Sequence, residues 1–139
     1  MTRVVRPAAL AICLGWAVAL ILPSLQLGDG EPLSGGALLI DGWRAAGAGI
    51  WAWFANPLFF CAAALLLAGR DRTARVPAAL ALVLGLSSLV TGPLAARAGY
   101  AIPALSFRAG FWLWLLSIFA LFILAWVAPF LKKKQWHSG

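Results

Sequence analysis

Few residues of this chain have side chains that could serve as a catalytic base, a nucleophile or a metal ligand. Its 139 residues include one histidine, His137, and two cysteines, Cys13 and Cys61, which do not form a Cys-x-x-Cys pair. A general base needs a supporting group, and a zinc site needs several converging ligands. His137 stands in a lysine-rich C-terminal tail with no acid beside it. We therefore expect no catalytic site, no metal and no cofactor, and we expect that the protein is not an enzyme.

Three of the four acidic residues fall in one segment, before Arg44: Asp29, Glu31 and Asp41. Its first part, Gly-Asp-Gly-Glu-Pro, is typical of a turn. In its second part, Leu38, Leu39 and Trp43 share one helical face. Asp41 and Arg44, three positions apart, can pair on the other face. The pattern predicts a short helix in the membrane interface around residues 38–46; a loop that runs directly into the next helix is an equal alternative.

The composition sets the chain apart from soluble domains. Hydrophobic residues make up 63% of it and charged residues 11%, whereas about 25% charged residues is ordinary. This composition excludes a disordered tail, a nucleic-acid-binding domain and a soluble enzyme. Each of four stretches without charge is as long as the roughly 20 residues of a bilayer-crossing helix. They are Pro7 to Gly28, Ala45 to Gly69, Val76 to Ala96 and Ala109 to Leu131.

These stretches predict an all-α fold. We expect a single transmembrane domain over residues 1–139, with four antiparallel transmembrane helices at about 7–27, 46–69, 76–96 and 110–131. A cleaved signal peptide is the alternative for the first helix. Its apolar run continues to Leu27, however, which is longer than the usual 7 to 15 residues of a signal peptide, and no convincing small-x-small cleavage site follows.

The basic residues predict the orientation. Eight of them would share one side of the membrane: Arg3, Arg6, Arg70, Arg72, Arg75, Lys132, Lys133 and Lys134. Only Arg44, Arg97 and Arg108 would lie on the other side. Short basic loops stay in the cytoplasm. We expect a multi-pass protein of the bacterial inner (cytoplasmic) membrane with both termini in the cytoplasm.

Tryptophan is frequent, with eight copies, and six of them suit two girdles at the membrane interfaces. These are Trp43, Trp51 and Trp53 near the second stretch, Trp112 and Trp114 in the fourth, and Trp136 beyond the lysines. Trp16 and Trp126 lie deeper in their stretches. We expect these two to pack between helices or to face lipid.

Small residues recur at helical spacing in two stretches: Ala11, Gly15 and Ala19 in the first, and Gly85, Ser88 and Gly92 in the third. Small faces let helix backbones approach closely in lipid. We interpret both faces as packing surfaces inside the bundle, with self-association as the alternative. Cys13 and Cys61 are interpreted as small hydrophobic residues.

Asn56 is the most polar side chain within any of the four stretches, and it precedes Pro57. Inside a helix, Pro57 would leave the carbonyl of Trp53 without its usual N–H partner and would disfavour the α conformation at Asn56. We expect a kink there. An amide at this depth must cap the broken turn, bond to another helix or line a wet cavity. We favour capping and interhelical bonding; a binding pocket and a translocation path are the alternatives.

A pattern runs through these residues: Ser34-Gly35, Gly42-Trp43, Ala52-Trp53-x-Ala55-Asn56-Pro57-Leu58, and Arg108 to Ser117. It resembles small, uncharacterised four-helix bacterial inner-membrane proteins over about Ser34 to Ala125. The resemblance implies the four-helix topology and no activity. Small multidrug transporters have a similar size, but they rely on a glutamate within the first helix, and the first stretch here contains no acid.

The four stretches lack Asp, Glu, Lys, Arg and His, whereas coupled transport needs an ionisable group within the membrane. We expect a non-catalytic accessory protein, subunit or immunity-type protein that acts through helix contacts. Its partners would be the lipid bilayer and another membrane protein or a second copy, and not nucleic acid. The alternative is an oligomeric channel or transporter, with a pore lined by Ser87, Ser88, Thr91 and Asn56. Changes at Asn56 or Gly85 should weaken association in the first case, whereas the second case predicts solute flux.

Overall fold

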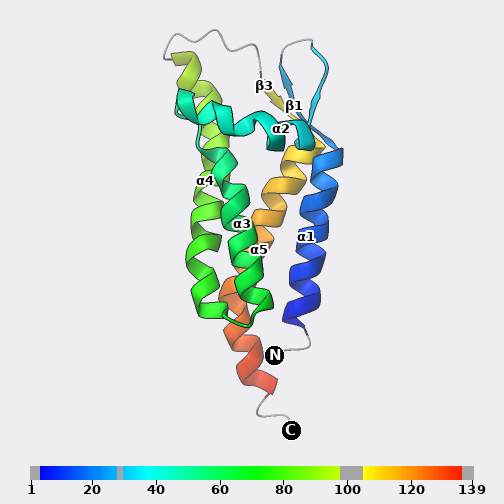
Figure 1. The fold of residues 1–139 in the computed structure, drawn as a ribbon, viewed down its shortest axis with the longest axis vertical. Coiled ribbons are helices and arrows are strands. Elements are labelled where there is room, and N and C mark those ends of the chain that lie inside the picture. Colours follow the sequence, from blue (N-terminus) through cyan, green and yellow to red (C-terminus); the bar gives the residue numbers. More distant parts are fainter. Residues whose placement is uncertain (1–3, 28–29, 98–104, 136–139) are drawn as a thin grey trace.

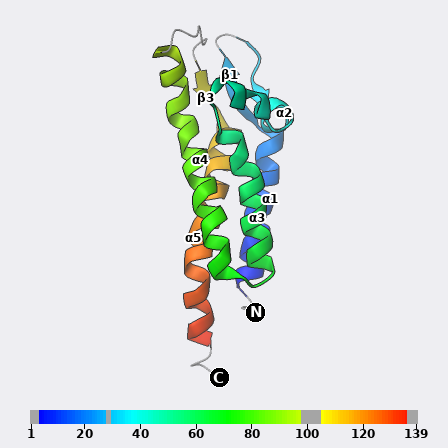
Figure 2. The same cartoon turned by 60° about the vertical axis from the view of Figure 1, so that its left-hand side comes forward.

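The computed structural model describes residues 4–27, 30–97 and 105–135. Four helices form an elongated bundle: α1 (Val5–Ile21), α3 (Ala55–Leu67), α4 (Asp71–Arg97) and α5 (Ala109–Gln135) (Figure 1). Helix α5 packs against both α1 and α4, and α3 packs mainly against α4. The start of α1, the turn between α3 and α4, and the last turns of α5 lie at one end, here called the termini end (Figure 2). The opposite end is the sheet end.

Many alanines lie in the centre of the bundle beside a few large residues, such as Phe59, Leu66 and Ile118, and large apolar side chains also cover much of its outside. The buried residues include eight alanines of α3, α4 and α5: Ala55, Ala62, Ala63, Ala74, Ala78, Ala81, Ala125 and Ala128. By contrast, Val76, Val83 and Leu116 are 60–65% exposed. A soluble bundle would bury its large apolar residues, because exposed apolar patches of this extent promote association in water. Close helix packing through small residues, with large apolar residues exposed on the outer surface, is expected for helices in lipid.

A small antiparallel sheet caps the bundle, and the sequence analysis did not predict it. Its strands are β1 (Pro23–Leu27), β2 (Leu33–Ser34) and β3 (Leu105–Phe107), in the order β2-β1-β3. Strand β1 pairs with β3 through Leu25 with Phe107 and Leu27 with Leu105. The chain is therefore mostly helical, as predicted. At this end, however, the segment that follows α1 and the segment that joins α4 to α5 are linked by the backbone hydrogen bonds of β1 and β3.

The first predicted span was wrong at its C-terminal end because Pro23 stops the helix. Leu22, the residue before this proline, is extended, with φ −78° and ψ 152°, as steric contact with the proline ring requires. Residues 23–27 carry no charge but include the polar residues Ser24 and Gln26, and they belong to β1. The second predicted span is also shortened, since residues 46–48 belong to the 3-10 helix η1 (Gly42–Ala48) and Gly49 has a positive φ of 79°.

Two helices in the described part of the chain are long and apolar enough to cross a membrane. They are Asp71–Val90 within α4, with a mean hydropathy of 1.7, and Ala109–Leu131 within α5, with 2.4. Val5–Ile21 and Ala52–Leu67 are apolar but shorter. The structure therefore supports full-length spans for two of the four predicted helices. Helix α4 begins at Asp71, five residues before the predicted start, and α5 continues to Gln135.

The segment before the second span is helical, as the first of the two alternatives predicts, and its place in the membrane interface stays a prediction. Helix α2 (Gly35–Asp41) continues into η1 and lies across the sheet end of the bundle (Figure 1). The Ser34 hydroxyl accepts a hydrogen bond from the Ala37 N–H at 3.2 Å and caps α2. The predicted ion pair is present, with 3.4 Å between Arg44 Nη1 and Asp41 Oδ1. The predicted turn at Asp29 lies outside the described residues.

Candidate functional site

Asn56 and Pro57 lie in the first turn of α3, directly after the 3-10 helix η2 (Ala52–Phe54). The predicted kink is absent because the α-helix begins here, and a proline is tolerated in a first turn. The carbonyl of Trp53 would ordinarily accept the N–H that Pro57 lacks. Instead, Asn56 Nδ2 donates a hydrogen bond to this carbonyl at 3.0 Å. The prediction that Asn56 caps the interrupted turn is confirmed.

The oxygen of the Asn56 amide accepts hydrogen bonds from two further helices. Its Oδ1 accepts a hydrogen bond from Trp16 Nε1 of α1 at 3.2 Å and from Trp114 Nε1 of α5 at 2.8 Å. An indole N–H can only donate, so these two donors determine which end of the amide is the carbonyl. We call Trp16, Trp53, Asn56 and Trp114 the Asn56 cluster. It joins three helices through one side chain that is 8% exposed.

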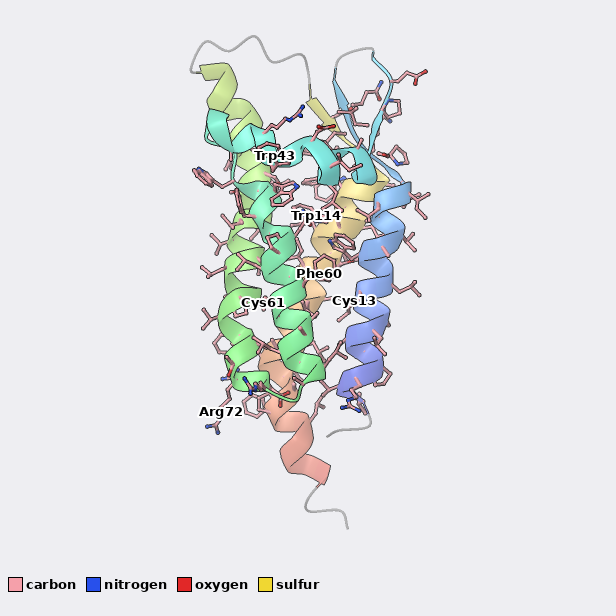
Figure 3. All side chains as sticks on the ribbon, viewed as in Figure 1. Cys13, Trp43, Phe60, Cys61, Arg72 and Trp114 are labelled. Atoms are coloured by element: carbon pink, nitrogen blue, oxygen red, sulfur yellow. The ribbon has the colours of Figure 1, made fainter. Side chains whose placement is uncertain are left out.

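Aromatic rings surround this cluster. Trp16 is 6% exposed, its ring is nearly parallel to that of Phe59 at 6.1 Å, and it meets Phe60 edge to face at 4.6 Å. Figure 3 shows Trp114 nearer the sheet end and Phe60 closer to the middle of the bundle. The indole N–H groups thus lie in an apolar environment, where an unmade hydrogen bond is costly.

The structure separates the predicted tryptophan anchors into two kinds. Trp43, Trp51 and Trp112 are 52–54% exposed, so their role at a membrane interface stays a prediction. Trp114 was placed in the same group, but its N–H points inward to Asn56. A helix exposes successive residues on different faces, so Trp112 and Trp114, two positions apart, cannot share one. Trp136 lies outside the described residues.

Trp53 fastens α2 to the start of α3. Its Nε1 donates to the carbonyl oxygen of Leu39 at 2.8 Å, and its ring meets Phe54 edge to face at 5.4 Å. The ring also lies against Gly42, where an added Cβ would be 2.8 Å from Trp53 Cδ1. Gly42 and Trp53 of the sequence pattern therefore contact each other, and the glycine makes room for the indole.

We expect Gly42→Ala to push the Trp53 ring away from the Leu39 carbonyl and to destabilise the protein by about 1 to 2 kcal/mol, a usual cost of overpacking. Thermal unfolding in detergent measures this, with Gly47→Ala as the control, since an added Cβ at Gly47 meets nothing within 4 Å. Equal melting temperatures of the two variants would contradict the assigned contact.

The Gly85 face of α4 packs inside the bundle. An added Cβ at Gly85 would lie 3.3 Å from Leu115 Cδ1 and 3.4 Å from Ile118 Cδ1 of α5. Ser88 Oγ donates to the Gly85 carbonyl at 2.5 Å, and Ser87 Oγ donates to the Leu84 carbonyl at 2.6 Å. The packing interpretation is confirmed for Gly85, and for Ser88 it stays a prediction. The Thr91 side chain and the surroundings of Gly92 lie outside the described part.

The predicted basic residues gather at the termini end. Arg70 and Arg72 are exposed, and Arg75 is partly buried. Lys132, Lys133 and Lys134 belong to the last turns of α5, but their side chains are outside the described part. The sequence analysis did not single out Asp71, which is 6% exposed in the first turn of α4. Its place before a long apolar helix was the available signal, since acids favour helix N-termini.

The residues that could ligate a metal are scattered over the part of the chain that the structure describes. No group of three or more His, Cys, Asp or Glu residues there could hold a metal ion. Cys13 and Cys61 are both free thiols, on α1 and α3 respectively (Figure 3). What the arrangement can do is join helices by hydrogen bonds and close packing. Searches of family models, of curated proteins and of solved structures find no match to this chain.

Proposed function

We propose that this chain is a small integral protein of the bacterial inner membrane, with four membrane-embedded helices and both termini in the cytoplasm. It would act without catalysis, as an accessory protein, subunit or immunity-type protein that contacts another membrane protein through its helices. We also propose that it belongs with the small four-helix inner-membrane proteins that its sequence pattern resembles.

The outer surface of the bundle supports a membrane location. Only 28% of the apolar window in α4 and 39% of that in α5 is buried, so neither helix resembles the core helix of a soluble protein. Helices α1 and α3 lie beside them (Figures 1 and 2). The 17 residues of α1 extend about 25 Å, near the lower limit for a span. The basic termini end supports a cytoplasmic orientation of that end.

The observation that carries the proposal is that three polar side chains in the described part of the bundle, those of Asn56, Ser87 and Ser88, already bond to the protein. Asn56 Oδ1 accepts two hydrogen bonds, and Asn56 Nδ2 donates to a backbone carbonyl. Ser87 and Ser88 donate to carbonyls of their own helix. A pore or solute site needs polar groups that are available to water or solute. These three residues, proposed above as pore-lining candidates, therefore favour a structural role over the alternative of a channel or transporter.

A tagged protein purified from its own host in mild detergent, with mass spectrometry of what stays bound, tests the proposal. A stoichiometric second membrane protein would support it. Photo-crosslinking amino acids placed at three exposed positions, Leu14, Val83 and Phe119, provide a second test. Only the positions on one face of the bundle should crosslink to the co-purified protein. The buried position Ala78 serves as the control. Asn56 and Gly85 are less suitable probes, because both lie inside the bundle.

Purification of the chain alone as a defined oligomer, with solute flux in reconstituted vesicles, would contradict the accessory role and favour the channel. Flux that persists in Asn56→Leu vesicles would further show that the Asn56 cluster is not part of the pathway.

A further inference from the structure

Helix α5 contains one proline, Pro129, near its C-terminal end. A proline inside a helix removes the N–H that would bond to the carbonyl four residues earlier. Here that carbonyl belongs to Ala125, which is fully buried. Six residues of α5 follow the proline, and they include the three lysines.

Arg75 of α4 contacts α5 at this interrupted turn. Its Nε donates to the Ala125 carbonyl oxygen at 3.5 Å, and its guanidinium carbon lies 4.8 Å above the ring centroid of Trp126. A planar guanidinium can make both contacts at once, whereas an ammonium group is a point charge without a stacking face. One side chain of α4 thus engages two successive residues of α5, one turn before Pro129.

We infer that Arg75 acts as a latch for the end of α5. Its contact with the turn in which Pro129 lacks an N–H fixes the direction in which residues 130–135 leave the bundle. These residues extend beyond the turn that joins α3 and α4 (Figures 1 and 2). Pro57 provides the internal comparison: the Trp53 carbonyl, which would ordinarily accept the N–H that Pro57 lacks, accepts from the side chain of Asn56, the residue before the proline. At Pro129 the donor comes from a neighbouring helix, so the direction of the α5 end depends on α4. The inference does not rest on the proposed function.

A double-mutant cycle between Arg75 and Pro129 tests the latch by thermal unfolding of the full chain in detergent. We expect Arg75→Gln and Arg75→Lys to lower the melting temperature by about 4 °C each in the natural sequence. In Pro129→Ala, position 129 regains its N–H and bonds to Ala125 itself. The same Arg75 substitutions should then cost less than half as much. Arg72→Gln, a change at an exposed arginine one turn earlier, should leave the melting temperature unchanged in both backgrounds.

Spin labels provide a second measurement that does not depend on stability. Labels at Arg72→Cys and Gln135→Cys, in a background with Cys13→Ala and Cys61→Ala, report the distance between the start of α4 and the end of α5. We expect Arg75→Lys to broaden or shift this distance distribution, and Pro129→Ala to abolish that effect. Arg75 effects that are equal with and without Pro129, or a distribution that Arg75→Lys leaves unchanged, would overturn the latch.

Discussion

Asn56→Leu is expected to lower the free energy of unfolding by about 3 kcal/mol, since each buried polar group left without its partner costs about 1 kcal/mol or more. Leucine has a similar size, so little of the loss comes from packing. The N–H groups of Trp16 and Trp114 lose their acceptor, and the carbonyl of Trp53 loses its side-chain donor but keeps the Ala55 N–H. Unfolding in mixed detergent micelles, followed by tryptophan fluorescence, measures this loss.

Single replacements provide the controls for this prediction. Trp114→Phe removes one donor to Asn56 and should cost about 1 kcal/mol. Trp112→Phe, on the exposed face two residues earlier, should cost almost nothing. If Asn56→Leu were as stable as the natural sequence, the amide would not hold the three helices together, and the cluster would have no structural role.

Gly35→Ala is expected to destabilise the protein by about 3 kcal/mol, the upper range for overpacking. An added Cβ would overlap the carbonyl oxygen of Ala19 and lie 2.9 Å from the Leu20 Cα. Both are backbone atoms of α1, which cannot rotate away as a side chain can. The Gly35 N–H also donates to the Leu22 carbonyl at 3.2 Å, so α2 cannot move away without losing this bond. Thermal unfolding in detergent measures the effect.

Gly110→Ala should have a similar cost from the other side of the same α1 terminus. Its added Cβ would overlap the Ser24 hydroxyl and lie 2.8 Å from the Leu22 carbonyl oxygen. Gly47→Ala is the matched control, because alanine meets nothing within 4 Å there and has the higher helix propensity. Loss of stability in Gly47→Ala of the same size would show that backbone freedom, and not close packing, explains the glycines.

The residues of the sequence pattern gather at the sheet end, and their contacts explain why the pattern has these residue types. Ser34 caps α2, and Gly35 lets α2 start against the end of α1. Gly42 receives the ring of Trp53, and Asn56 replaces the donor that Pro57 lacks. Residue type and spacing identify these positions in the sequence, but they do not show which of the positions contact each other.

The amino-acid sequence by itself determined the mostly helical class, the Asp41–Arg44 pair, and the need for a donor to the Trp53 carbonyl. Each follows from local physics: apolar runs, three-residue spacing on a helix, and the missing proline N–H. Pro23 was a local signal of the same kind, and it marks where the first helix ends.

Only the tertiary structure decided the rest. Strand β1 alternates the polar residues Ser24 and Gln26 with Leu25 and Leu27, which is a local strand signal that was not used in predicting the first helix. Its partner β3 comes from a distant part of the chain, so local pattern could not identify the strand that β1 pairs with. The partners of Asn56, on α1 and α5, and the contact of Arg75 with α5 likewise depend on which helices become neighbours. Periodicity shows which face of a helix is apolar or small, but the neighbour that this face meets is set by packing of the whole chain.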